Sequence, residues 1–253
     1  MIYFFCGAEK NASHYQRFIV EEALKQRGLD FKIAGNEIFH AYRWVGGWRL
    51  LHELHRDDGQ RYLCKGHWGR SVERRILLSV PSVQVFLIWR HLRDVMISSF
   101  HFENNRRPPG YGTFAEYYRS EGRQFFIRQL LYRRGWGELA GHSRVFQVNF
   151  EDLKRDFPTH AGRMLDFAGI EGVDLKVLEE QLSLEQMRQT RNDPEGKFFR
   201  KGEPGEHRTF AFPPEVLEDM RQLEAQSSPL LNLLLAGTRG RRLVGMGPAP
   251  ARG

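Results

Sequence analysis

Cysteine is scarce in this sequence, and long hydrophobic runs are missing. Only Cys6 and Cys64 among its 253 residues are cysteine, and no spacing of Cys and His matches a zinc site. We therefore expect two reduced thiols, as in a cytoplasmic protein, and no bound metal. No apolar run reaches the about 18 residues that a membrane-spanning helix needs. The opening MIYFFCGAEK also lacks the basic segment and long apolar core of a signal peptide, so we predict a cytoplasmic chain without a membrane span.

Positive charge is in excess, which favours anionic partners. The chain has 38 Lys and Arg against 31 Asp and Glu, a net charge of +7. Nucleic acid, an acidic membrane, a polyanionic sugar or a phosphorylated small molecule would each suit this charge, which does not choose among them. We do not expect nucleic-acid binding, because no stretch interleaves basic and aromatic residues in the manner of single-strand binding surfaces.

Short apolar segments alternate with segments of helical periodicity. Strands are predicted over 2–6, 31–34, 61–65, 83–89 and 144–150, and helices over 14–27, 92–102 and 151–168. We expect residues 103–143 to be partly helical and 190–210 to form a polar loop. The alternation predicts a three-layer α/β/α fold with a central parallel sheet. A chain of this length fits one domain over residues 1–240, followed by a flexible Gly/Pro/Ala-rich tail over 241–253.

Polar clusters follow three of the predicted strands. In a parallel sheet such loops meet at the carboxyl edge, where ligands bind. Lys10 lies in a Gly-containing turn that leads into a helix, an arrangement that suits a phosphate although the Gly-Lys-Ser/Thr ending of a Walker A motif is absent. Lys65 and His67, two residues apart at a strand end, point to the same side. Arg90 and Ser98 combine a guanidinium fork with a hydroxyl, which also suits a phosphate.

Each cluster, taken alone, also has a simpler interpretation. The first loop suits a solvated turn in which Ser13 caps a helix. A histidine at a strand end is commonly a surface residue, and the basic pair in FFRKG, 198–202, suits either a solvated loop or a lid over a phosphate. The clusters therefore gain weight only as a set.

As a set, these segments resemble the sulfotransferases that use 3′-phosphoadenosine 5′-phosphosulfate (PAPS), in particular the cytosolic type. RHLRDVMISSFHF is similar to the family's RNPRDVxVSxxHF, VNFEDLKRDFPTHAGRMLDFAGI to its YEDLKxDP helix, and SLEQMRQTRNDPEGKFFRKGEPGE to its SFxxMKxN…FFRKGxxGD. CKGHWG and EKNASHY are weaker matches to its KTH and PKSGTTW segments. The five motifs follow the family's order from residue 8 to about residue 210.

The resemblance implies a P-loop NTPase-like sulfotransferase fold and transfer of a sulfuryl group from PAPS to a hydroxyl or amine. The acceptor would be a small molecule or a sugar, the product 3′-phosphoadenosine 5′-phosphate (PAP), and no metal would be needed. The implied catalytic residues are His67 as general base, Lys10 and Lys65 around the transferring group, and Ser98. The implied donor-binding residues are Lys10, Asn11, Ala12, Ser13, His14, Tyr15, Arg90, Ser98, Phe150, Leu184, Arg200, Lys201 and Gly202.

The sequence departs from the family pattern in its phosphate and adenine positions. Ala12 replaces a glycine, His14 a threonine, Tyr15 a tryptophan, Phe150 a tyrosine and Leu184 a phenylalanine. These changes leave open a second hypothesis, a sulfotransferase-like protein that binds nucleotide or polyanion with weak or no catalysis. A nucleotide kinase is a third hypothesis, disfavoured by the missing Walker A ending and by the lack of an acidic magnesium site in the sequence.

The acceptor and the oligomeric state stay open. Aromatic residues at 36–50 and 103–135, among them Phe39, Tyr117 and Tyr118, suit either an apolar acceptor pocket or the core. The arginines in the second of these segments would instead suit an acidic or sugar acceptor: Arg106, Arg107, Arg119 and Arg123.

Overall fold

The chain folds around one parallel sheet. The computed structural model describes all residues except 36–37, 40–43, 58, 108, 191–199 and 227–253. The described residues form a five-stranded sheet of order β2-β3-β1-β4-β5, in which every pairing is parallel. Its strands are β1 Ile2–Cys6, β2 Lys32–Ala34, β3 Tyr62–Gly66, β4 Val83–Trp89 and β5 Val145–Asn149. The predicted α/β fold with a central parallel sheet is confirmed.

The central strand explains why both faces of the sheet are covered. Every residue of β1 is buried, and alternate side chains of a strand point to opposite faces. Tyr3 and Phe5 enter one hydrophobic core, whereas Ile2, Phe4 and Cys6 enter the other. A strand that is apolar on both faces requires helices on both sides.

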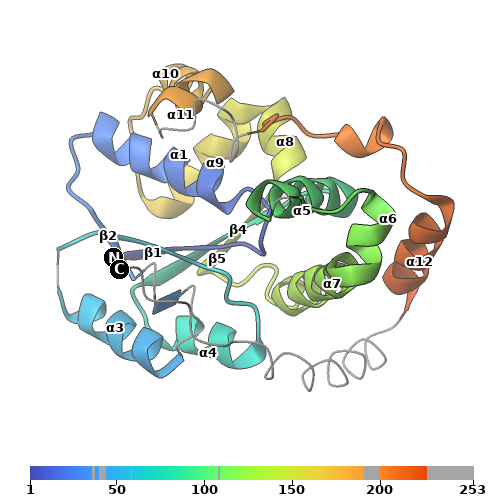
Figure 1. Ribbon diagram of the computed structural model, residues 1–253. Helices are drawn as coiled ribbons and strands as arrows, with labels where there is room; N and C mark the ends of the chain where they lie inside the picture. The colour runs from blue at the N-terminus through green and yellow to red at the C-terminus, as the bar shows by residue number, and fades with distance from the viewer. Residues whose placement is uncertain (36–37, 40–43, 58, 108, 191–199, 227–253) are drawn as a thin grey trace, which may run out of the picture.

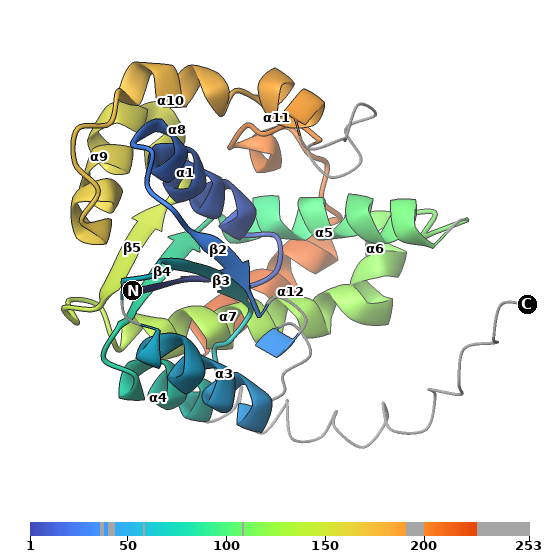
Figure 2. The ribbon, with the colours of Figure 1, turned by 90° about the vertical axis from the view of Figure 1, so that its left-hand side faces the viewer.

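Two helical layers cover these faces (Figures 1 and 2). The layer above the sheet in Figure 1 consists of α1 Ser13–Gln26, α8 Phe150–Arg155, α9 Phe157–Ala168, α10 Leu175–Gln181 and α11 Leu184–Thr190. The layer below it contains α3 Trp44–Arg56 and α4 Ser71–Ser79, and the adjacent α7 Arg123–Gly137 adds Tyr132 and Trp136 to the same core.

A third helical group lies to one side of the sheet (Figure 1). Here α5 Leu92–Arg106, α6 Phe114–Tyr117, the π-helical turn Tyr118–Gly122 and α12 Pro214–Ala225 pack with α7 around a separate apolar cluster. A short 3-10 turn, Glu206–Arg208, precedes α12. Among the described residues no helix is both long and apolar enough to cross a membrane.

The predicted helix over 151–168 is wrong in one respect, because it is two helices. α8 ends at Arg155, and Asp156 caps α9 by accepting a hydrogen bond from the backbone N–H of Thr159 at 3.2 Å. Pro158 lies in the first turn of α9, where its missing N–H costs nothing, but it could not continue α8. The proposed tail over 241–253 lies outside the described residues, and the single domain over 1–240 stays a prediction.

Candidate active site

Three strand ends and the helices that follow them surround one cavity of about 550 Å³. β1 lies between β3 and β4, with Cys6 opposite both Gly66 and Leu87, so the loops after these strands start side by side. Most of the sequence-predicted site residues line this cavity: Lys10, Ala12, Ser13, His14, Tyr15, Lys65, His67, Arg90, Ser98, Phe150, Leu184 and Gly202. Asn11, Arg200 and Lys201 are not part of the lining.

The loop between β1 and α1 adopts an unusual backbone. Lys10 and Ala12 have φ values of 66° and 63°, in the left-handed region that residues with a Cβ rarely adopt. Strain of this kind persists where the surroundings hold the backbone in place. Because Ala12 precedes the first residue of α1, the strained turn brings the helix N-terminus to the cavity.

Asn11 holds this turn from the side away from the cavity. Its side chain is buried, and its amide donates to Gln129 Oε1 at 2.7 Å and to the carbonyl oxygen of Glu9 at 3.2 Å. Its carbonyl oxygen accepts a hydrogen bond from the backbone N–H of Arg90 at 3.1 Å. Asn11 therefore joins two site loops to α7. Gln129, which also donates to Glu9 O at 3.0 Å, had no sequence signal, because it is one of several polar residues in α7.

Two lysines in the cavity wall have pKa values well below the usual value for lysine. Burial, more than any neighbouring charge, lowers the pKa of Lys10 to about 8, and its Nζ lies 3.0 Å from the centre of the Phe102 ring. Lys65 is 2% exposed, and burial followed by the charges of Arg17 and Lys10 lowers its pKa to about 8. A bound anion would offset both the lost hydration and the mutual repulsion, so this part of the cavity suits a polyanion.

His67 has its tautomer set by the backbone. Its Nδ1 lies 2.5 Å from the carbonyl oxygen of Gly7. A carbonyl oxygen only accepts hydrogen bonds, so Nδ1 carries the proton and the basic lone pair of the neutral ring is at Nε2. A histidine oriented in this way at a cavity wall can accept a proton from a hydroxyl.

Arg90 is a half-buried cation in the cavity wall. Its Nη2 lies 3.4 Å from the carbonyl oxygen of Glu203, and its guanidinium lies 5.4 Å from the centre of the Phe150 ring. Its Nε is buried, and among the described residues it has no hydrogen-bond partner. A buried donor without a partner costs free energy, and an anion in the cavity would satisfy it.

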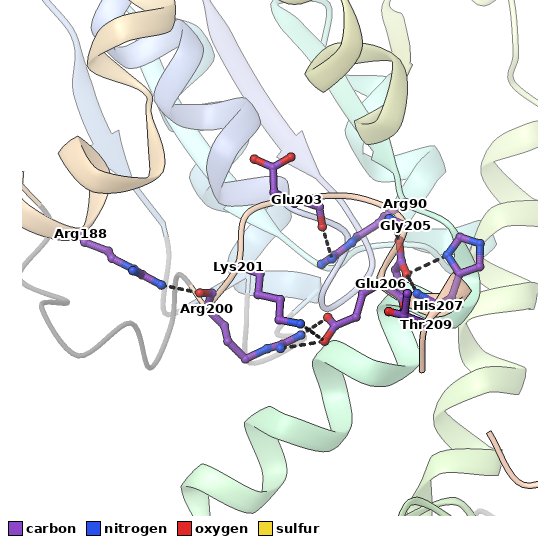
Figure 3. Close-up of polar contacts among 10 residues, drawn as sticks. Arg90, Arg188, Arg200, Lys201, Glu203, Gly205, Glu206, His207 and Thr209 are labelled. Carbon is purple, nitrogen blue, oxygen red and sulfur yellow. Dashed lines mark hydrogen bonds and ion pairs between the residues drawn. The ribbon is translucent and has the colours of Figure 1, made fainter. Parts of the chain in front are cut away.

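Arg200 and Lys201 instead pair with an acidic residue of their own loop (Figure 3). Arg200 contacts both carboxylate oxygens of Glu206, and Lys201 Nζ lies 2.9 Å from its Oε1. Burial raises the pKa of Glu206, but the hydrogen bonds and charges of Arg200 and Lys201 outweigh this and lower it to about 2. Only Gly202 of the predicted triplet lines the cavity, so phosphate binding by the two cations stays a prediction.

The structure also brings together residues that are far apart in the sequence. Nitrogen and oxygen atoms of His91, Asp94 and His207 lie within 4.8 Å of one another. Sequence reasoning missed this cluster because His207 is more than a hundred residues away from His91 and Asp94.

The remaining part of the cavity mixes aromatic and charged side chains: Phe102, Tyr117, Phe125, Glu103, Glu121, Arg106, Arg107 and Arg128. Of the residues suggested for an acceptor pocket, Tyr117, Arg106 and Arg107 line the cavity, although Tyr117 also belongs to the hydrophobic cluster beside α7. Phe39 and Tyr118 belong to hydrophobic cores and are not part of the lining.

The arginines of this part differ in their pairing. Arg106 contacts Glu103 at 2.9 Å, and Arg107 contacts Glu121 at 3.7 Å. Arg128, exposed at the wall, lies 5.6 Å from the centre of the Phe125 ring and pairs with no acidic residue in the described part of the chain. Its charge is therefore available to a ligand.

The chain belongs to the sulfotransferase family, because the model of the sulfotransferase domain matches residues 73–227, more than half of its length. It is 28% identical over 106 residues to Sulfotransferase 1C2 of Homo sapiens, across 40% of this chain and 36% of that protein. The same protein of Oryctolagus cuniculus is 26% identical over 104 residues, across 39% of this chain and 35% of the relative. These matches therefore span about a third of the curated relatives.

Solved structures share the fold over most of the chain. Mouse sulfotransferase SULT7A1 complexed with PAP has a TM-score of 0.66 at 17% identity, across 93% of this chain and 88% of that one. Retinol dehydratase in complex with androsterone and inactive cofactor PAP has a TM-score of 0.64 at 17% identity, across 90% and 83%. The predicted sulfotransferase fold is thereby confirmed.

Proposed function

We propose that this protein is a PAPS-dependent sulfotransferase that modifies a hydroxyl or amine of a small molecule and releases PAP. The observation that carries the proposal is the grouping of Lys10, Lys65, His67 and Arg90 around one cavity at the carboxyl edge of the sheet. Membership of the sulfotransferase family supports it, as do the PAP complexes of proteins with the same fold.

The donor would lie between two sets of cations. Lys10 and the start of α1 would bind the 5′ phosphosulfate, while Arg90 and Ser98 would bind the 3′ phosphate. The unpartnered Arg90 Nε and the two desolvated lysines support this assignment, because each gains from an anion. Tyr15, Phe150 and Leu184 at the cavity wall would contact the adenine, and Tyr15 can stack on it.

The chemistry would be an in-line displacement at sulfur. The acceptor oxygen or nitrogen forms a bond to sulfur as the bond from sulfur to the phosphate oxygen of the donor breaks. His67 Nε2 takes the acceptor proton, and Lys10 stabilises the negative charge that develops on the departing phosphate. Lys65 would stabilise the transferring group. Positioning and charge stabilisation dominate such transfers, and this scheme assigns both to side chains of this chain.

The test is a transfer assay paired with a binding measurement. The full chain is titrated with PAP by calorimetry and then incubated with labelled PAPS and a panel of phenols, alcohols, amines and sugars. We expect PAP binding and labelled product with at least one acceptor. Binding with no turnover across the panel would favour the weakly catalytic alternative. Absence of both would overturn the proposal, and EDTA-sensitive ATP turnover would favour a kinase.

We further propose that the acceptor is a partly aromatic molecule with an anionic group, because Phe102, Phe125 and Arg128 share the cavity wall, and Arg128 forms no ion pair within the described part of the chain. Two matched phenols test this, 4-hydroxyphenylacetate and the neutral 4-hydroxyphenylethanol. Arg128→Gln should raise the KM of the anionic phenol about three- to fivefold, as expected for an exposed ion pair, and leave that of the neutral phenol unchanged. An equal change for both phenols would contradict it.

A cytoplasmic location and the absence of nucleic-acid binding complete the proposal. Cys6 and Cys64 are both buried and free, which suits a reducing compartment. Fractionation of the source cells and a DNA- and RNA-binding assay would test these two points.

A further inference from the structure

We propose that Asp94 is a positioning residue for the donor, which ties the loop over 200–207 to α5 and so places it beside Arg90. The inference rests on the proposed function, since it concerns the same nucleotide site. Asp94 belongs to the stretch after β4 that sequence analysis singled out, but none of the predicted catalytic or binding roles used it.

Asp94 is the attachment point of a distant loop. Its side chain is 0% exposed, and its carboxylate accepts hydrogen bonds from the backbone N–H groups of Gly205 and His207, both at 2.7 Å. A third contact joins it to His207 Nδ1 at 2.9 Å. Burial raises the pKa of Asp94, but the hydrogen bonds from Gly205 and His207 outweigh that effect and lower it, so the acceptor remains a carboxylate. Hydrogen bonds to a buried carboxylate are stronger than those between neutral groups.

The loop has the conformation that this attachment requires. Gly205 has φ 90°, a value that disfavours any residue with a Cβ, and this turn directs the N–H groups of Gly205 and His207 at the Asp94 carboxylate. The rings of His207 and His91 stack with centres 3.7 Å apart and planes at 11°. His91 lies next to Arg90, so the stack adds a second contact between the loop and the stretch that begins α5.

The attachment determines where the basic side chains lie. Glu206 stands between the two anchored residues, Gly205 and His207, and it holds Arg200 and Lys201. Arg90 contacts the carbonyl oxygen of Glu203 in the same loop (Figure 3). One buried carboxylate on α5 therefore sets the position of the loop cations relative to Arg90, the proposed phosphate ligand.

A metal ion is the competing explanation of the cluster formed by His91, Asp94 and His207. Both carboxylate oxygens of Asp94 already accept hydrogen bonds from the loop. The two imidazole rings are stacked with centres 3.7 Å apart, so their in-plane lone pairs lie in two separate, nearly parallel planes and do not converge on one ion. Metal sites need converging lone pairs. We therefore assign the cluster to attachment of the loop.

The experiment compares Asp94→Asn with a matched carboxylate elsewhere in the full chain. Asp219 lies on α12 and accepts three hydrogen bonds as well, in this case from the side chains of Tyr118 and Arg123. We expect Asp94→Asn to raise the PAPS KM and the PAP dissociation constant about tenfold, while kcat at saturating PAPS and the acceptor KM change less than about threefold. Asp219→Asn should lower the melting temperature without changing the donor constants.

Unchanged PAP binding in folded Asp94→Asn, or an equal loss in Asp219→Asn, would overturn the inference. If wild-type protein does not bind PAP, the proposed function itself fails. Should Asp94→Asn not fold, two other variants disturb the same attachment. His207→Ala removes the ring contact to Asp94 and the stack on His91, and Gly205→Ala disfavours the positive φ of the turn. Each must weaken PAP binding. A rise in the wild-type melting temperature with added Zn²⁺ that Asp94→Asn abolishes would make the cluster a metal site and also overturn it.

Discussion

The two polypeptide segments beside the proposed donor site are held in place by different means. The loop between β1 and α1 follows directly from the central strand, and a buried amide, Asn11, fixes it from behind. The segment 200–207 lies more than a hundred residues after α5 begins, and buried Asp94 holds it by two backbone N–H groups. The first segment is therefore a direct strand-to-helix connection, whereas the second is held to α5 by polar contacts.

The way in which each segment is attached indicates which function it can serve. The first loop and the end of β3 hold groups at fixed positions, as a reacting centre requires, and they carry Lys10, Lys65 and His67. The second segment carries Arg200 and Lys201 in a pair with Glu206, which a phosphate would have to displace. We expect changes in the first segment to alter the reaction or both the reaction and donor binding, and changes in the second to alter donor affinity alone.

The largest expected effect is at the fixed reacting centre. His67→Ala should lower kcat about 10²- to 10⁴-fold, the usual contribution of a general base, while PAP binds within about twofold of wild type. Steady-state assays and calorimetry measure the two quantities. His142→Ala is a control, because that ring accepts a hydrogen bond from the backbone N–H of Arg144, near the amino end of β5. Near-wild-type turnover in His67→Ala would contradict the assignment of His67 as the general base.

The next largest expected effect is a pH dependence of PAP affinity, which arises from Lys10 and Lys65. Both Lys10 and Lys65 have pKa values lowered to about 8, so both are charged below that pH and lose their charge as pH rises through it. PAP affinity should fall above pH 8, by up to about tenfold per pH unit for each lysine that titrates. Calorimetry from pH 6.5 to 9.5 tests this, and Lys10→Arg should weaken the dependence. Constant affinity across that range would show that these lysines do not carry donor binding.

The sequence predicted the fixed segment better than the attached one, for a physical reason. The continuous apolar run of β1 and the basic turn after it are local patterns, so the position of Lys10 beside Lys65 follows from parallel pairing of neighbouring strands. The split between α8 and α9 was missed, although Asp156 and Pro158 carry the local signal. A capping aspartate followed by proline should have outweighed the apolar periodicity.

The attached segment depends on contacts that no local pattern contains. The partners of Asp94 are backbone N–H groups 111 and 113 residues further along the chain, which no pattern around Asp94 indicates. The pairing of Arg200 with Glu206 is equally hidden, because a loop has no periodicity from which side-chain directions follow. Gln129 had no signal either, since its role arises only where α7 meets the first loop.

A smaller effect is expected from the amide that fixes the first loop. Asn11→Ala leaves the Gln129 oxygen and the Arg90 N–H without their partner, and it should lower the free energy of unfolding by about 1–3 kcal/mol. It should also raise the PAPS KM. The control is Asn149→Ala, whose exposed amide contacts Asp152 at 3.0 Å and should matter little. Chemical denaturation and kinetics measure both variants, and equal stability of the two would contradict the role of Asn11.

The smallest effect concerns the pair that the phosphate must displace. Glu206→Gln removes the charge that neutralises Arg200 and Lys201 but keeps a side chain of similar size, so PAP should bind about two- to fivefold more tightly at low salt. The difference should shrink as ionic strength rises, since these cations lie near the surface. The matched control is Glu218→Gln, which removes an exposed carboxylate beside Arg221 on α12. Weaker PAP binding in Glu206→Gln would mean that Glu206 orders Arg200 and Lys201 for the phosphate instead of competing with it. The second segment would then be as pre-organised as the first.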